Sequence, residues 1–278
     1  MKTFVSKFEG SDGLSFYVHG WESDVQPKAV VVLVHGLGEH SGRYMNVVNH
    51  FVPKGYAVYA LNHIGHGKSE GARANVERFS DFTTTLKTYF DMVRAAQPGK
   101  PIFLLGHSMG GLMSCTYLLE HQADFKGAII SAPLAKISEN TPPALITIGK
   151  IFSTIMPQMG VLAVDATAVS TDPAVVEAYI NDPLNFHDKV PARLAAEILS
   201  AIKRLNAEAA AIRLPIILVQ GSADKLVDPG GAQIIYGKAS STDKTLKMYK
   251  GYYHEVFNEP GRERVLDDVE VWLERHLN

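Results

Sequence analysis

The fold of this chain is organised around the segment Lys100-Pro-Ile-Phe-Leu-Leu-Gly-His-Ser-Met-Gly-Gly-Leu-Met-Ser-Cys-Thr-Tyr-Leu-Leu-Glu120. It predicts a short apolar strand, a sharp turn around Ser108, and a helix over residues 109–121. A G-x-S-x-G pattern in that setting is typical of a nucleophile elbow, a turn that lifts a serine hydroxyl above the edge of a sheet. Gly106 and Gly110 fit this turn because a Cβ at either position would crowd the backbone. The alternative is a glycine-rich turn whose serine caps the helix.

Apolar runs on both sides of this segment predict the sheet. The run Ala29–Val34 consists of six apolar residues rich in β-branched types, which indicates a strand covered on both faces. Similar runs follow at residues 56–61, 102–105, 128–130, 216–219 and 245–249, and an N-terminal hairpin is expected at residues 3–9 and 14–20. Helices are expected at residues 42–52, 79–96, 109–121, 192–211, 229–238 and 261–276. The alternation predicts an α/β fold with a doubly wound, mostly parallel sheet.

One interval interrupts the alternation. More than 80 residues separate Ser131 from Ile216, which is too long for one crossover connection. Several prolines lie in the first part of this interval. We therefore expect a core formed by residues 1–133 and 191–278, with residues 134–190 inserted as a cap of short helices.

The run Thr141–Val164 within this cap carries only one charged residue, Lys150. Its three prolines and this lysine argue against a transmembrane span. Two interpretations stay open: a packing surface of the cap itself, or an apolar portal for a lipid chain that dips into a membrane or micelle surface. The residues assigned to substrate contact on the second interpretation are Ile148, Phe152 and Ile155.

Composition excludes some classes of function. With 278 residues, 46% of them hydrophobic and 20% charged, the chain can bury a large core. A net charge of -2 offers no basic excess to neutralise phosphates, so no nucleic-acid partner is expected. The single cysteine, Cys115, is expected as a small buried residue, with a reactive thiol as the alternative. The N-terminus lacks a signal-peptide pattern, and cytoplasmic residence is expected.

A serine nucleophile needs a base, and the base needs a carboxylate that orients it. On a fold with this elbow the acid follows the serine in the chain and the histidine comes last. Only His254 and His276 follow the candidate acids beyond residue 219. His276 lies near the C-terminus in an amphipathic helix, whereas His254 directly follows a strand. We therefore predict that His254 is the base.

Two aspartates compete for the role of the acid. Asp228 precedes a proline at the start of an expected helix, where an aspartate N-cap is an ordinary structural feature. Asp224 has no such explanation. Asp224 is the predicted acid, and Asp228 is the alternative.

Backbone amides are expected to stabilise a developing oxyanion. One comes from Met109, the residue after the serine, and the other from Leu37 in the glycine-rich loop 35–40. His35 is expected to form structural hydrogen bonds beneath this loop.

Neither a metal site nor a cofactor is expected. His63 and His66 lie close together but have no cysteine or carboxylate at ligand spacing, so metal ligation is the less favoured reading. The Gly36–Gly38 pair lacks the third glycine of a dinucleotide-binding loop, because position 41 is Ser41.

These residues together resemble the monoacylglycerol lipases of the α/β-hydrolase superfamily. The shared segments are residues 35–44, 63–71, 104–111, 182–184, 220–226 and 243–249, followed by Tyr253-His254. The resemblance implies a serine hydrolase that cleaves monoacylglycerol to fatty acid and glycerol through an acyl-enzyme. It also implies a triad of Ser108, Asp224 and His254, with Leu37 and Met109 as oxyanion donors. By resemblance, the glycerol end of the pocket is lined by Glu39, Arg43 and Tyr179.

Two positions depart from the family pattern. Asn62 stands where an aspartate is usual, and Phe257 stands where the mammalian enzymes carry a second histidine. Related lysophospholipases and carboxylesterases share several of the segments, so a lysophospholipase or a broad carboxylesterase is the alternative enzyme. A non-catalytic lipid-binding member of the fold is the alternative from another class.

Overall fold

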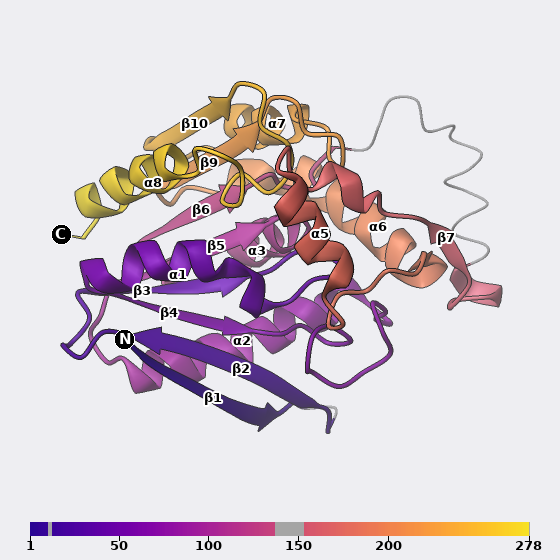
Figure 1. The fold of residues 1–278 in the computed structure, drawn as a ribbon, viewed down its shortest axis with the longest axis horizontal. Coiled ribbons are helices and arrows are strands. Elements are labelled where there is room, and N and C mark those ends of the chain that lie inside the picture. Colours follow the sequence, from indigo (N-terminus) through magenta and orange to yellow (C-terminus); the bar gives the residue numbers. More distant parts are fainter. Residues whose placement is uncertain (11–12, 137–152, 278) are drawn as a thin grey trace.

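The computed structural model describes residues 1–10, 13–136 and 153–277, and an eight-stranded sheet forms its centre (Figure 1). The strand order is β1-β2-β4-β3-β5-β6-β9-β10. β2 pairs antiparallel with β1 and β4, and all other neighbours pair in parallel. The strands are β1 Lys2–Glu9, β2 Ser15–Glu22, β3 Ala29–Val34, β4 Tyr56–Leu61, β5 Ile102–His107, β6 Gly127–Ser131, β9 Ile216–Gly221 and β10 Lys244–Tyr249. The predicted α/β architecture is confirmed.

Helices cover both faces of the sheet, as its apolar strands require. Val30, Val32 and Val34 of β3 join one buried cluster with α2, α3, α6 and α7. The alternate residues of β3 join a second cluster with α1 and α8. Figure 1 shows α1 and α8 together on one face. The helices are α1 Met45–Phe51, α2 Phe79–Ala96, α3 Met109–His121, α5 Pro173–Asn181, α6 Ala192–Glu208, α7 Gly230–Lys238 and α8 Glu263–Arg275. Short 3₁₀ turns are η1 Ser41–Tyr44, η2 Val52–Lys54, η3 Gln122–Asp124, η4 Ala166–Ala168 and η5 Ala209–Ala211.

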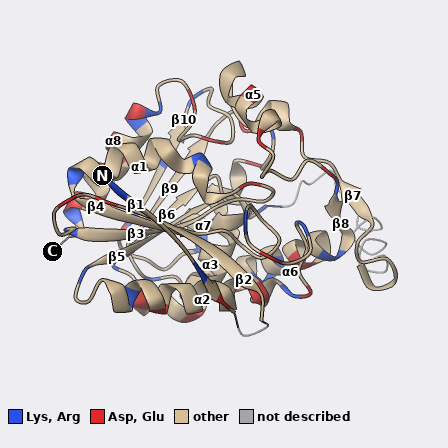
Figure 2. Ribbon diagram, turned by 60° about the horizontal axis from the view of Figure 1, so that its bottom comes forward, with Lys and Arg blue, Asp and Glu red and all other residues tan. Residues whose placement is uncertain are grey.

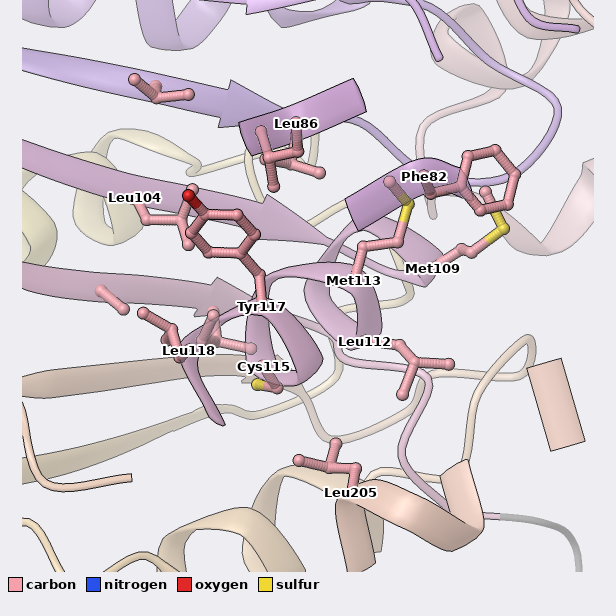
Figure 3. Packing of buried hydrophobic residues seen from close by; sticks show 14 of the residues in the cluster. Phe82, Leu86, Leu104, Met109, Leu112, Met113, Cys115, Tyr117, Leu118 and Leu205 are labelled. Atoms are coloured by element: carbon pink, nitrogen blue, oxygen red, sulfur yellow. The ribbon is translucent and has the colours of Figure 1, made fainter. Parts of the chain in front are cut away.

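Helix α3 is the most deeply buried of these helices. Every residue from Met109 to Leu118 is buried. Figure 3 shows Leu112 and Met113 of α3 among side chains of α2 and α6, and Cys115 lies in the same cluster. Burial raises the pKa of the Cys115 thiol to about 12, so this cysteine stays protonated, as expected for a packing residue. Each buried aliphatic side chain stabilises this arrangement by about 1.5–3 kcal/mol. The start of α3 is therefore held firmly against the sheet.

The chain reverses its direction of winding between β3 and β5. β4 lies on one side of β3 and β5 on the other, so the loops that leave β3 and β5 diverge from a common point. The pairing of Val34 with Gly106 brings the loop after β3 next to the turn after β5. In open α/β sheets, ligands bind at such a switch point, outside the carboxyl ends of the strands.

The described part of residues 134–190 lies at this carboxyl end of the sheet (Figure 1). Its described part contains η4, α5 and a strand β7, Gly160–Leu162, which pairs antiparallel with β8, Val190–Pro191. The sequence predicted short helices here and missed the strand pair. β7 and β8 are too short to produce a periodic sequence signal, and β8 leads directly into α6.

Charged side chains lie on the outer helices, with both signs interspersed on α2, α6 and α8 (Figure 2). This distribution agrees with the small net charge of the chain. Within the described ranges, every helix is too short or too polar to cross a membrane.

We predict that Gly110→Ala destabilises the fold, because its Cβ would lie 2.2 Å from the Val34 carbonyl oxygen and 2.3 Å from that of His35. Overpacking of this kind costs about 1–3 kcal/mol. Gly237→Ala is the matched control, since no heavy atom of the described residues lies within 4 Å of its Cβ position in α7. The control should stabilise the helix by up to about 1 kcal/mol. Urea unfolding measures both changes, and equal effects would contradict the close approach at Gly110.

Candidate active site

Ser108 occupies a strained turn between β5 and α3. Its φ of 56° and ψ of −120° lie outside the regions that most side chains adopt. Its amide donates to the Ser131 carbonyl over 2.9 Å, and its own carbonyl accepts from the amides of Leu112 and Leu134 over 3.1 Å each. The Ser108 side chain makes no helix-capping hydrogen bond. The interpretation of this serine as a helix cap is therefore wrong.

The two elbow glycines are required by close packing. A Cβ on Gly106 would lie 2.2 Å from Ser114 Oγ and 2.6 Å from the Gly110 carbonyl oxygen. A Cβ on Gly110 would meet the backbone at the end of β3. The turn can therefore form only where side chains are missing on both sides of Ser108.

His254 and Asp224 form a buried pair. The His254 Nδ1–H group donates to Asp224 Oδ2 over 2.8 Å. The other carboxylate oxygen accepts the amides of Leu226 and Val227, at 2.9 and 3.0 Å. Gln220 Nε2 also donates to Oδ2, over 3.0 Å. These bonds hold the carboxylate in one orientation, and they hold the neutral imidazole in the tautomer whose Nε2 can accept a proton.

The electrostatics of this pair favour proton transfer to His254. Burial alone would lower the pKa of His254, but the hydrogen bond and negative charge of Asp224 outweigh it and raise that pKa above its usual value. Burial would raise the pKa of Asp224, and the hydrogen bond to His254 reverses this and lowers it. Asp224 therefore stays ionised and stabilises the imidazolium that a general base forms.

The alternative acid and base have other partners. Asp228 accepts the Gly230 amide over 2.8 Å and pairs with Lys136 at 3.0 Å. Helix α7 begins at Gly230 with Pro229 as its N-cap, so Asp228 is not the N-cap that the sequence predicted and lies one residue before it. His276 pairs with Asp243 at 2.9 Å.

The glycine-rich loop after β3 lies against Ser108. A Cβ on Gly36 would lie 3.1 Å from Ser108 Cβ, so the backbone of this loop runs directly beside the serine. Leu37 lines the same cavity as Ser108. Met109 is the first residue of α3, where backbone amides lack partners within the helix. These are the two residues from which the sequence predicts oxyanion donors.

Two histidines, His35 and His63, form hydrogen bonds with the backbone of this loop. The His35 Nδ1–H group donates to the Gly36 carbonyl over 2.8 Å, and Nε2 accepts the His63 amide over 3.1 Å. His63 Nε2–H donates back to the His35 carbonyl over 3.1 Å. The expectation of a structural His35 is confirmed, and its two bonds require a neutral ring. Asn62 also serves this region, since its Oδ1 accepts the amide and the hydroxyl of Ser41.

The residues assigned by resemblance to the glycerol end form one charged cluster. Glu39 Oε1 accepts the Gly36 amide and the Tyr44 hydroxyl, each at 2.6 Å. Arg43 Nε lies 3.3 Å from Glu39 Oε2, and its guanidinium carbon lies 4.5 Å from the ring centroid of Tyr179. Burial, followed by the neighbouring charge of Glu255, raises the pKa of Glu39.

Glu255 completes this cluster, and the sequence did not predict its role. Both of its carboxylate oxygens accept from Arg43 Nη2 at 2.6 Å. The available signal was a charged residue directly after the base and before the apolar Val256 and Phe257. Its partner lies 212 positions away, so only the fold brings the two together. Phe257 itself is buried in the core.

A cavity of about 330 Å³ joins these groups. Its polar part is lined by Ser108, His254, Glu39, Tyr179 and Glu255, and its apolar part by Leu37, Leu134, Leu162, Val164, Val169 and Val227. Of the predicted portal residues, Ile148 and Phe152 lie outside the described residues. Ile155 is 72% exposed and does not line this cavity. A second hollow of about 550 Å³ shares Lys225 with it but contains no member of the predicted triad.

Comparison with known proteins identifies relatives along nearly the whole chain. Residues 25–261 match the family model described as serine aminopeptidase, S33. A monoacylglycerol lipase of Mycolicibacterium smegmatis is 37% identical, with 97% of this chain and 96% of that protein covered. A monoglyceride lipase of Rattus norvegicus is 33% identical, with 96% and 89% covered. The crystal structure of a Paleococcus ferrophilus monoacylglycerol lipase superposes with a TM-score of 0.83 at 30% identity, covering 99% of this chain and all of that one.

We predict that Asp224→Asn reduces kcat for ester hydrolysis by about 10⁴-fold, because the amide cannot hold the required tautomer of His254. Asp228→Asn is the matched control: its carboxylate contacts Gly230 and Lys136 and should matter little for kcat. Steady-state kinetics on any soluble ester distinguishes the two. A severe loss in Asp228→Asn with a mild one in Asp224→Asn would exchange their roles.

We also predict that the fold weakens below pH 6.5. Burial, followed by the charge of His66, lowers the pKa of His63 to about 3. Burial also lowers the pKa of His66 to about 4, opposed by its hydrogen bond to the Ile64 carbonyl and aided by the charge of Arg73. Below pH 6.5 the unfolded chain therefore binds protons that the folded protein excludes, and each histidine costs roughly 1.4 kcal/mol of stability per pH unit until its folded pKa is reached. Urea unfolding between pH 7.5 and 5 measures this slope.

His66→Phe should reduce this dependence on pH. Among the described residues His66 Nε2 has no hydrogen-bond partner, and the ring lies beside Phe82 at 6.2 Å, so phenylalanine fills the site and gives up only the bond from Nδ1–H to the Ile64 carbonyl. An unchanged slope in this variant would contradict the assignment.

Proposed function

Because the chain belongs to the serine aminopeptidase S33 family and matches monoacylglycerol lipases along nearly its full length, we propose that it hydrolyses monoacylglycerol to a free fatty acid and glycerol. The observation that carries this proposal is that His254, held by Asp224, lines the same cavity as the elbow serine. A lipid-binding protein without catalysis would not need an oriented imidazole beside a strained serine.

The reaction follows from the roles of these residues. Ser108 Oγ attacks the ester carbonyl carbon while His254 Nε2 takes its proton. The Leu37 and Met109 amides bind the oxyanion. The carbon–oxygen bond to glycerol then breaks, and the imidazolium protonates the departing oxygen. Water repeats the sequence on the acyl-enzyme, which releases the fatty acid and restores the serine. No cofactor takes part in this scheme.

The two ends of the cavity suit the two ends of the substrate. Glu39 and Tyr179, which Arg43 contacts, serve the glycerol end, and Leu162, Val164 and Val169 contact the acyl chain. Each methylene group buried contributes about 0.8 kcal/mol, so chain length should be graded gently. A site that hydrogen-bonds hydroxyl groups can discriminate by roughly 10⁴-fold. Selectivity for the alcohol should therefore exceed selectivity for the chain.

Substrate is proposed to reach the cavity through the inserted segment, with residues 134–190 acting as the cap over a core of residues 1–133 and 191–278. Ile155, Met156 and Val161 are exposed, and so are Leu162 and Val164, which also line the cavity. Exposed apolar side chains that continue into a cavity suit contact with a membrane or micelle surface. The protein would act in the cytoplasm and attach to such a surface only peripherally.

We predict that 1-monooleoylglycerol is hydrolysed faster than lysophosphatidylcholine, dioleoylglycerol or trioleoylglycerol at equal interfacial concentration. Titration of the released oleate measures all four rates. Equal rates would favour a broad carboxylesterase, and a preference for lysophosphatidylcholine would favour a lysophospholipase.

Ser108→Ala should lose about 10⁴- to 10⁶-fold in turnover while its unfolding curve stays unchanged. Activity retained in that variant would contradict the mechanism.

A further inference from the structure

A buried cation lies between two carboxylates beside the triad. Arg43 contacts Glu255 through Nη2 and approaches Glu39 through Nε. The side chains of Arg43, Glu39 and Glu255 are 8%, 6% and 6% exposed. With so little water, their mutual charges act at higher strength than on a surface. The cluster carries more negative than positive charge when both carboxylates are ionised.

Glu255 is held in place independently of Arg43. Asn258 Nδ2 donates to Glu255 Oε2 over 2.8 Å. The Glu255 amide donates to the Val169 carbonyl over 2.8 Å, and its carbonyl accepts the Asn258 amide over 2.7 Å. Its carboxylate is thus fixed at the cavity wall, one residue from the catalytic base.

The cavity wall is acidic at this end. Of the described residues that line it, Glu39, Glu255 and Asp165 are acidic, and Lys225 is the basic one. The Lys225 ammonium group donates to the Tyr253 hydroxyl and lies over that ring, 4.2 Å from its centroid. Burial raises the pKa of Glu39, but even a neutral Glu39 leaves Arg43 and Glu255 cancelling each other. A phosphate group needs free arginine or lysine donors, whereas hydroxyl groups can donate to these carboxylates.

We propose that Glu255 is a specificity residue that selects esters of an uncharged polyol and rejects the same esters when the polyol carries a phosphate. It does so by neutralising Arg43 and by keeping a fixed carboxylate at the alcohol end of the cavity. This inference rests on the proposed function, because it assigns the polar end of the cavity to the leaving alcohol.

The test compares 1-oleoylglycerol with 1-oleoylglycerol 3-phosphate, which share the acyl chain and the ester bond. The wild-type protein should prefer the uncharged ester by at least about 100-fold in kcat/KM, since like charges repel strongly in a buried site. Glu255→Gln preserves the shape of the side chain and removes the carboxylate that contacts Arg43 Nη2, which lowers the net negative charge of the cluster by one while Glu39 stays beside Arg43. This variant should lower the preference at least about tenfold, chiefly through a lower KM for the phosphate ester.

Asp165→Asn is the matched control, because it removes a negative charge from the same wall without touching Arg43. The Asp165 carboxylate contacts Thr167. Its substitution should leave the preference close to that of the wild type. An unchanged preference in Glu255→Gln, or an equal fall in Asp165→Asn, would overturn the inference.

Two further measurements distinguish an inactive variant, a wrong inference about Glu255 and a wrong proposed function. Hydrolysis of p-nitrophenyl butyrate, whose alcohol is not a polyol, shows whether Glu255→Gln is folded and active at Ser108. If the Glu255→Gln variant is inactive on p-nitrophenyl butyrate, the wild-type protein alone still tests the inference. Equal kcat/KM values of the wild type for the two oleoyl esters would overturn it. A wild-type protein that hydrolyses p-nitrophenyl butyrate but not 1-oleoylglycerol would refute the proposed function instead.

Discussion

The left-handed turn at Ser108 is the constraint on which the rest of the structure depends. A non-glycine residue in such a conformation costs about 1–3 kcal/mol and persists only where its surroundings hold it. Backbone bonds to Ser131, Leu112 and Leu134 hold it from three directions. The buried α3 and the missing side chains at Gly106 and Gly110 leave the backbone no other path. The strain therefore presents the hydroxyl at the switch point of the sheet.

Two further loops meet this turn, and one charged cluster connects them. The loop after β3 supplies Glu39 and Arg43, and the loop after β10 supplies His254 and Glu255. The contact between Arg43 and Glu255 joins the loop expected to bind the oxyanion to the loop that carries the base. Glu39 extends the connection to the Gly36 amide. The loop that carries Leu37, the loop that carries His254 and the polar wall of the cavity thus share one set of interactions.

The sequence was most informative where local pattern and tertiary packing agree. Strands Ala29–Val34 and Tyr56–Leu61 have the predicted bounds because a strand buried on both faces is apolar throughout. Helices Phe79–Ala96 and Met109–His121 also have the predicted bounds. The pairing of Asp224 with His254 followed from chain order, from the position of His254 after a strand and from the expected capping role of Asp228.

Other features could not be predicted, because they depend on residues far apart in the chain. β7 and β8 form only by pairing with each other, and Arg43 meets Glu255 only after folding. Asp228 is not the N-cap that the sequence predicted, because Pro229 takes that position and Asp228 lies one residue before it. The cavity residues Leu162 and Val164 belong to the apolar run that the sequence singled out, yet periodicity could not tell which of its members face the serine.

The central claim is that Ser108 is the nucleophile that receives the acyl group. Reaction with a long-chain alkyl fluorophosphonate, followed by peptide mass mapping, tests it most directly, because the phosphorus forms a stable bond to an activated serine oxygen. The account predicts one adduct per chain, on the peptide that contains Ser108, and slower labelling in the presence of 1-oleoylglycerol. An adduct on another serine, or an unlabelled protein that still hydrolyses esters, would contradict it.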